Sequence, residues 1–155
     1  MGSQVEKVET DVYIKASPEK FHDVFCNRTH HIANVCPEKI QGVDLHEGEW
    51  GTEGSIVFWN YVHDGKACVA KEVVEAIDRE KNKIVFKVIE GDLLDDYKSF
   101  RIIVEVSEAT AQNGSVVHWT MEYEKLKNHT PDPHTLMQLA IDVSNDIDSH
   151  LSQTN

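Results

Sequence analysis

Two carboxyl groups and one phenol lie close together near the middle of the chain, in Glu90, Asp92 and Tyr97. Such groups can perform general acid–base catalysis when they face an apolar cavity, because desolvation raises their pKa values. The Glu90-Gly91-Asp92 segment, however, has the composition of a turn, in which acidic side chains are normally solvated. The solvated turn is the simpler interpretation, and the three residues remain candidates for a catalytic role.

Apolar and polar side chains alternate over residues 98–106 and 115–124, as they do in a β-strand with one buried face. We predict that the inward-facing side chains include Phe100, Ile102, Trp119, Met121 and Tyr123. Rings and a polarizable thioether on one wall suit shape-based binding of an apolar molecule. Ordinary core packing also explains each of these residues when it is taken alone.

The nine histidines do not form a metal-binding motif. His30 and His31 are adjacent, and neighbours on a helix point about 100° apart, so the two rings are poorly placed to bind one ion. Cys26, Cys36 and Cys68 lack CxxC spacing and have no neighbouring catalytic motif. We therefore expect neither a metal nor a cofactor.

A glycine-rich segment, residues 48–54, could suggest phosphate binding, because glycines let backbone amides approach an anion closely. The Walker motif requires a Lys and a Ser or Thr directly after its last glycine. This segment contains Glu49 and Glu53 instead, and it continues as Ser55-Ile56. The pattern argues against a nucleotide site.

Charge and composition limit the possible partners. The 155 residues make up one domain, residues 1–155, with a net charge of −12. That charge repels phosphate backbones and anionic membranes, so we expect no nucleic acid partner. No segment has about 20 apolar residues in a row, and residues 1–10 lack the features of a signal peptide. We expect a cytoplasmic protein with free thiols, either a monomer or a weak dimer.

The periodicity of apolar residues predicts an α+β fold. Ser17-Pro18-Glu19 is a helix-start signal, and a short helix should end near Cys26. A second short helix is expected over residues 30–36, and a long one of about five turns covers Leu136 to Leu151. A curved antiparallel sheet would cover the apolar face of the long helix. Strands are predicted over residues 5–14, 40–46, 56–62, 67–77, 83–90, 98–106 and 115–124.

Six segments match one known family in collinear order: 17–21 (SPEKF), 39–48 (KIQGVDLHEG), 54–61 (GSIVFWNY), 63–66 (HDGK), 88–93 (VIEGDL) and 118–125 (HWTMEYEK). They resemble major latex proteins, relatives of the birch-pollen allergen and of pathogenesis-related class 10 proteins. The resemblance runs from about Val5 to His150. It implies a helix-grip fold: a seven-stranded curved antiparallel sheet around the C-terminal helix, two short helices closing one end, and a large internal cavity. The glycine-rich segment would be a mobile hairpin at the cavity rim.

The resemblance also implies a function, namely binding or carrying small hydrophobic plant metabolites of steroid, hormone, flavonoid or terpenoid type, linked to defence or stress. It favours Trp59 and Tyr61 over Ile56 and Phe58 as the inward residues of their strand. The predicted ligand-binding residues are Trp59, Tyr61, Phe100, Ile102, Trp119, Met121, Tyr123, Met137 and Ile141.

Two other functions remain open. Some relatives with this fold are enzymes of alkaloid or terpenoid metabolism, so the same cavity could serve a cofactor-free cyclase or isomerase that supplies one acid or base. The chain could also be a regulatory module whose loop docks a protein partner when ligand is bound. We favour the non-catalytic carrier.

Overall fold

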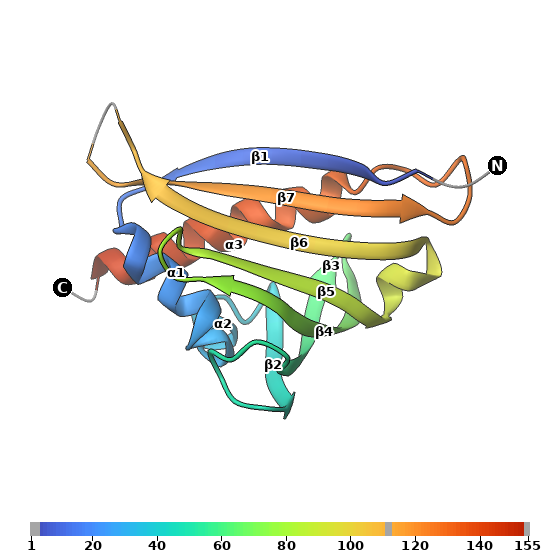
Figure 1. The fold of residues 1–155 in the computed structure, drawn as a ribbon, viewed down its shortest axis with the longest axis horizontal. Helices are drawn as coiled ribbons and strands as arrows, with labels where there is room; N and C mark the ends of the chain where they lie inside the picture. Colours follow the sequence, from blue (N-terminus) through green and yellow to red (C-terminus); the bar gives the residue numbers. More distant parts are fainter. Residues whose placement is uncertain (1–3, 111–112, 154–155) are drawn as a thin grey trace.

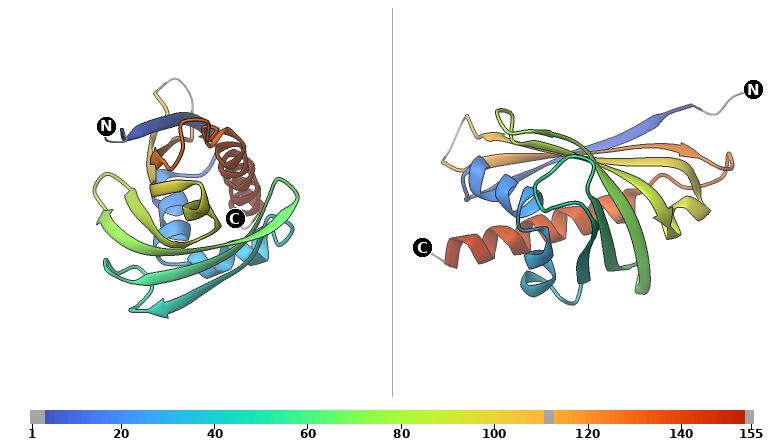
Figure 2. Two further views of the ribbon diagram at one scale, coloured as in Figure 1. Left: turned by 90° about the vertical axis from the view of Figure 1, so that its right-hand side faces the viewer. Right: turned by 60° about the horizontal axis from the view of Figure 1, so that its bottom comes forward.

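The computed structural model describes residues 4–110 and 113–153. Seven antiparallel strands form one sheet in the order β1-β7-β6-β5-β4-β3-β2, and the sheet bends around α3 (Figure 1, Figure 2). The elements are, in chain order, β1 (Glu6–Ile14), α1 (Pro18–Cys26), the 3₁₀ helix η1 (Thr29–His31), α2 (Ile32–Val35), β2 (Ile40–Glu47), β3 (Ile56–His63), β4 (Lys66–Asp78), β5 (Lys83–Gly91), the 3₁₀ helix η2 (Asp92–Asp95), β6 (Tyr97–Glu108), β7 (Ser115–Lys125) and α3 (His134–Gln153).

The predicted architecture is confirmed, because all seven expected strands and the long C-terminal helix are present. The alternation that predicted the inward faces is also borne out by burial. On β7 the buried side chains include Val117, Trp119, Met121 and Tyr123. On β3, where the sequence left two faces in competition, Val57, Trp59 and Tyr61 are buried.

Helix α1 begins where the sequence indicates. The Ser17 hydroxyl accepts a hydrogen bond from the Lys20 amide (3.3 Å), and Pro18 occupies the first turn, where its missing N–H is not needed. Phe21 and Phe25 then fall on one buried face, and their ring centroids are 5.4 Å apart. The cap therefore sets the helix so that Phe25 reaches the interior of the sheet.

The second short helix differs from its prediction. Residues 30 and 31 belong to η1, residues 32–35 form α2, and Cys36 is the C-cap of α2. Thr29 is buried, and its hydroxyl donates to the Phe25 carbonyl oxygen (2.7 Å), which ties η1 directly to the end of α1. This local bond favours a tight 3₁₀ turn before the α-helical turn can start.

The segment Glu90-Gly91-Asp92, expected to be a turn, contains the end of β5 and the start of η2. Gly91 adopts φ +126°, and a Cβ atom there would lie 2.3 Å from the Val69 carbonyl oxygen. Only glycine allows β4 to pass this closely. The chain then turns into η2, which buries Leu93.

Helix α3 lies across the concave side of the sheet (Figure 2). Its buried residues recur at helical spacing and comprise Leu136, Met137, Ala140, Val143, Ser144 and Ile147. The C-terminal half is anchored by Asp148, whose carboxylate accepts from the amides of Lys15 and Ala16 (2.9 Å each). Among residues 4–110 and 113–153, no helix is long and apolar enough to cross a membrane.

All three cysteines are free and buried. Burial raises the thiol pKa of Cys26, Cys36 and Cys68, and that of Cys36 reaches about 11. Cys26 ends α1, Cys36 follows α2, and Cys68 lies on β4 opposite Tyr61. Since the thiolate is the reactive form, none of the three has the environment of a nucleophile.

Candidate ligand-binding cavity

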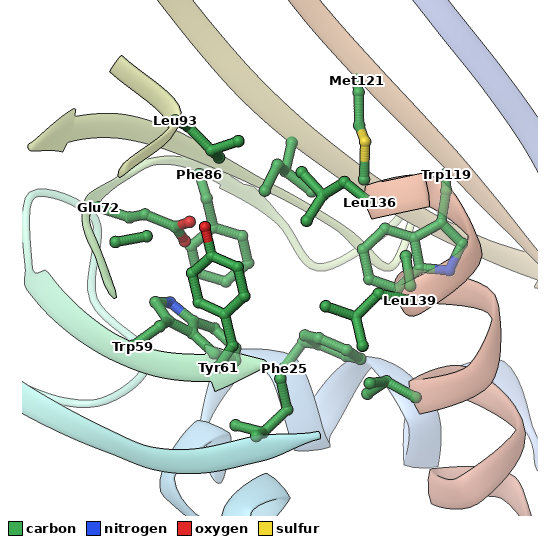
Figure 3. Close-up of a pocket in the computed structure, with 15 residues that line it drawn as sticks. Phe25, Trp59, Tyr61, Glu72, Phe86, Leu93, Trp119, Met121, Leu136 and Leu139 are labelled. Carbon is green, nitrogen blue, oxygen red and sulfur yellow. The ribbon is translucent and has the colours of Figure 1, made fainter. Parts of the chain in front are cut away.

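A cavity of about 90 Å³ lies between the concave face of the sheet and α3 (Figure 3). Every strand except β1 contributes to its wall, together with α1, η2 and α3. The resemblance implied a large cavity, and this volume is well below the roughly 300–1,000 Å³ of typical ligand pockets. The lining residues are Phe25, Ile40, Trp59, Tyr61, Ala70, Glu72, Phe86, Leu93, Ile102, Trp119, Met121, Leu136, Leu139, Ala140 and Val143.

Strand pairing positions one end of the cavity. On β3 and β4, Trp59 pairs with Ala70, and the neighbouring inward pair is Val57 with Glu72. Trp59 and Glu72 are therefore diagonal neighbours on the inner face, a spacing that long side chains can bridge. The small Ala70 side chain leaves open space beside the Trp59 ring. Figure 3 shows Trp59, Tyr61, Glu72 and Phe86 gathered at this end.

Glu72 is the unexpected member of the wall. Its exposed fraction is only 4%, and no ion-pair partner for it exists among the described residues. Desolvation raises the pKa of the Glu72 carboxyl to about 8, and the facing indole N–H of Trp59 opposes this shift only in part. The carboxyl is therefore mostly protonated at neutral pH, so it can both donate and accept hydrogen bonds.

Two more polar atoms at this end lack partners. Trp59 Nε1 and the Tyr61 hydroxyl are buried and form no hydrogen bond within the described residues. Burial raises the pKa of Tyr61, with smaller contributions from Cys68, Glu72 and Asp92, so its hydroxyl stays protonated. A buried polar group without a partner costs about 1–3 kcal/mol. We call Trp59, Tyr61 and Glu72 the polar end of the cavity.

The opposite end of the cavity is apolar. The Trp119 indole N–H donates to Ser144 Oγ (2.8 Å), so only the ring of Trp119 remains to face a ligand. Phe25 packs edge-on against that ring, with centroids 5.4 Å apart. Met121, Leu136 and Leu139 complete this end in Figure 3. The cavity is thus an apolar chamber with polar atoms concentrated on one side.

Five of the nine predicted ligand-binding residues line the cavity: Trp59, Tyr61, Ile102, Trp119 and Met121. Phe100 and Tyr123 are buried beyond its wall, where their rings pack against each other and against Tyr97. On α3 the lining residues follow the 136, 139, 140 and 143 stripe. Met137 and Ile141 are each one position past that stripe, about 100° around the helix, and do not line the cavity.

The three predicted acid–base candidates also lie outside the cavity wall. Glu90 is exposed and pairs with Lys71 (3.4 Å). The Asp92 carboxylate accepts from the Val69 amide (2.7 Å). The Tyr97 hydroxyl donates to the Pro131 carbonyl oxygen (2.7 Å), and burial raises its pKa to about 12.

Sequence reasoning missed Glu72, although one signal was present. Ala70, Glu72 and Val74 share one face of a long strand, and an acid between two small apolar residues is unusual there. That strand carries apolar residues on both faces, so alternation alone did not show which side of it faces inward.

The glycine-rich segment between β2 and β3 does not contribute to the cavity wall. It is tied to the protein by several contacts: the Glu53 carboxylate accepts from the Ile77 amide (2.8 Å), and Arg79 donates to the Gly51 carbonyl oxygen (2.9 Å). In the part of the chain that the structure describes, no group of three His, Cys, Asp or Glu side chains could hold a metal ion.

Residues 3–154 match the family model of the pathogenesis-related protein Bet v 1 family. The chain belongs to this family. MLP-like protein 43 of Arabidopsis thaliana is 51% identical over 150 residues, which are 97% of this chain and 95% of that relative. The crystal structure of major latex-like protein 151 from Panax ginseng has 40% identity and a TM-score of 0.90, and the match covers 96% of this chain and 98% of that one.

Two other similarities limit which properties of related proteins can be assigned to this chain. MLP-like protein 34 of Arabidopsis thaliana is 58% identical over 94% of this chain, but the chain spans about half of that relative, 46% of its length. Norcoclaurine synthase of Thalictrum flavum has a TM-score of 0.71 at 18% identity, covering 95% of this chain and 96% of that one, which shows a shared fold alone.

Proposed function

We propose that this Bet v 1 family member binds and carries a small, largely apolar molecule in the cavity. The observation that carries the proposal is the wall itself, which is built almost entirely from aromatic and aliphatic side chains of different elements around an open space. Moving an apolar molecule from water into such a space is favourable, at about 25 cal/mol for each Å² buried. The metabolite classes that this family membership favours are steroids, hormones, flavonoids and terpenoids.

The cavity volume limits the ligand unless the protein adapts. An apolar cavity of about 150 Å³ accommodates benzene, so a space of about 90 Å³ is smaller than the one known to hold a single aromatic ring. A flavonoid or steroid requires side chains to move outward. Met121 is suited to this, because it faces the cavity and its unbranched thioether adopts several rotamers at low cost.

Displacement of a neutral fluorescent probe, N-phenyl-1-naphthylamine, by candidate sterols, flavonoids and terpenoids tests the proposal. Trp119→Ala should weaken probe binding by roughly tenfold or more, because it removes a large apolar surface from the wall. Tyr13→Ala is the control, since Tyr13 is exposed on β1 away from the cavity. Absence of probe uptake by the wild-type protein would refute the proposal. Native mass spectrometry of protein from its own source would identify the physiological ligand.

Glu72 favours a second candidate, an enzyme that uses the same cavity. A carboxyl with a pKa near 8 in apolar surroundings is suited to general acid or base catalysis near neutral pH. A cofactor-free cyclase or isomerase needs one such group. Glu72→Gln should then abolish conversion of candidate terpenoid or alkaloid precursors, followed by mass spectrometry, while retaining their binding. Wild-type protein that binds these compounds and converts none of them would leave the carrier as the function.

The cellular context remains a prediction from the sequence and the family. A role in defence or stress responses, a cytoplasmic location and a monomeric or weakly dimeric state are all consistent with the fold. Fractionation of the source tissue and the molar mass in solution would test the last two.

A further inference from the structure

The polar end of the cavity contains two buried polar atoms without hydrogen-bond partners, beside one buried carboxyl group. Trp59 Nε1 and the Tyr61 hydroxyl are buried without partners in the described chain, and the Glu72 carboxyl is buried without a counter-ion there. All three residues line the same cavity, whose remaining wall is apolar (Figure 3). Buried polar groups are normally paired, so two unpaired atoms and a buried carboxyl around one space indicate a partner that occupies the space.

The chemistry of the three groups restricts that partner. The indole N–H can only donate a hydrogen bond, so the partner must offer a lone pair. The Tyr61 hydroxyl and a protonated Glu72 can each donate or accept. A hydroxyl group satisfies all of them, because its oxygen accepts from the indole and from one of Tyr61 and Glu72, while its hydrogen is donated to the other.

A cationic amine is the main rival. The net charge of −12, the Glu72 carboxyl and the surrounding rings would all attract an ammonium group. An ammonium has three donors and no acceptor, however, so it cannot itself accept a hydrogen bond from the Trp59 indole N–H. It would also require Glu72 to lose its proton in an apolar environment.

We propose that Trp59, Tyr61 and Glu72 form a hydrogen-bonding subsite that selects neutral apolar molecules with a hydroxyl group at one end. The inference rests on the proposed function, because it names the class of ligand that the cavity takes. It assigns the polar end to the hydroxyl and the Trp119 end to the apolar body. The ligand therefore binds in one orientation along the cavity.

Three probes of matched shape test the subsite: toluene, benzyl alcohol and benzylamine. Each contains a single aromatic ring, which keeps the outward movement of side chains small, and they differ only in a methyl, hydroxymethyl or aminomethyl group. Dissociation constants are measured by amide chemical shift titration. Benzyl alcohol should bind about tenfold more tightly than toluene, the effect of roughly one net hydrogen bond, and more tightly than benzylamine.

Variants separate the roles of the three residues. Tyr61→Phe and Glu72→Leu should each reduce the preference for benzyl alcohol over toluene several-fold, while toluene affinity changes little. Glu72→Gln should keep most of the preference, because an amide also donates and accepts. Tyr13→Phe makes the same change as Tyr61→Phe at an exposed position on β1, and it should have no effect.

The possible outcomes distinguish the two proposals. Equal affinities for toluene and benzyl alcohol would overturn the subsite and leave the apolar carrier intact. Tightest binding of benzylamine, with release of a proton to the buffer, would overturn it in favour of a cation site. Failure of all three probes to bind would overturn both proposals together. Because the comparison is made on the wild-type protein, it stands even if one variant fails to fold.

Discussion

At the scale of single residues, the protonation of Glu72 is coupled to folding. Burial raises its pKa in the folded protein to about 8, whereas a solvated glutamate has a value of 4.5. The folded state therefore holds the proton more strongly than the unfolded state does. The stabilisation that protonated Glu72 contributes to the folded state is fully present below pH 4.5, and it is lost as the pH rises from 4.5 through 8.

Replacing Glu72 by Gln should remove this pH dependence. The variant and the wild type should differ least near pH 4.5, and the variant should gain relative stability up to about pH 8. The shift from 4.5 to about 8 corresponds, at about 1.4 kcal/mol per pKa unit, to a gain on the order of 5 kcal/mol. Urea denaturation at pH 4.5, 7 and 9 measures it.

The matched control is Glu90→Gln, the same change at an exposed carboxyl. We expect it to alter the free energy of unfolding by less than about 0.5 kcal/mol. A difference between Glu72→Gln and wild type that stays constant across the pH range would show that Glu72 ionises normally in the folded protein.

Residue placement could be predicted from the sequence only where alternation was unambiguous. Trp119 and Met121 lie opposite a clearly polar face of β7, and both line the cavity as predicted. Glu72 was missed because β4 has apolar residues on both faces, so its inward side depends on its register with β3. The register of two strands depends on their pairing in the folded sheet, so the local sequence pattern of one strand does not reveal it.

At the scale of elements, His118 links the edge strand β1 to β7. Its imidazole lies between the Asp11 and Glu9 carboxylates, with 2.9 Å between His118 Nε2 and Glu9 Oε1. The hydrogen bond to Asp11, followed by that to Glu9, raises the pKa of His118 above its ordinary 6.5. The stabilisation that protonated His118 gives the folded protein is fully present below pH 6.5, and it is lost as the pH rises through the raised pKa of His118.

A proton NMR titration of the His118 ring should give a pKa above 6.5. Asp11→Asn should lower that value more than Glu9→Gln does, since Asp11 is the larger cause. The effect on global stability should remain below about 1 kcal/mol, because the pair is partly exposed and screened by solvent. A titration that neither variant changes would contradict the geometry.

Asp148 should be the most sensitive acidic position on α3. Asp148→Ala leaves the amides of Lys15 and Ala16 without their partner, and we expect a loss of about 1–2 kcal/mol in the free energy of unfolding. Asp142→Ala, on the same helix, removes the acceptor of a hydrogen bond from the exposed Gln138 side chain and should cost less than about 0.5 kcal/mol. Similar losses for both variants, measured by urea denaturation, would argue against this anchor.

Strands and α-helices were predictable, whereas the 3₁₀ helices were not. The long α3 has a broad apolar stripe, and each strand is bounded by polar turns such as Asp64-Gly65, where both residues adopt positive φ. The helices η1 and η2 are only three and four residues long, too short for any periodicity to develop. They depend on contacts such as the bond between Thr29 and Phe25, which form only in the folded chain.

At the scale of the whole molecule, the cavity lowers the stability of the fold, because its wall lacks packing contacts, but it leaves the space that the proposed ligand would need. Ala70 is the cross-strand neighbour of Trp59, and its small side chain faces the cavity. Ala70→Val should fill part of the cavity, raise the free energy of unfolding by about 0.5–1 kcal/mol and weaken binding of apolar probes. Thermal denaturation and probe titration on the same samples measure both effects. Lower stability with unchanged binding would show that the space beside Ala70 is already filled.

The cavity's existence followed from the architecture, but its volume did not. A bent sheet around one helix encloses space between them. The remaining volume of about 90 Å³ is the small difference between that space and the side chains that fill it. It depends on the rotamers of residues such as Met121 and Leu139, which composition does not specify.

The rate at which the three buried cysteine thiols react with a labelling reagent would report local opening of the structure around each of them. Cys26, Cys36 and Cys68 report on α1, on the α2 to β2 junction and on β4, and each must become solvated before an alkylating reagent can modify it. The order in which mass spectrometry detects their labelling would rank these three regions by lability without any engineered tag. Faster labelling of Cys68 than of the other two would mean that the β3–β4 pair opens first.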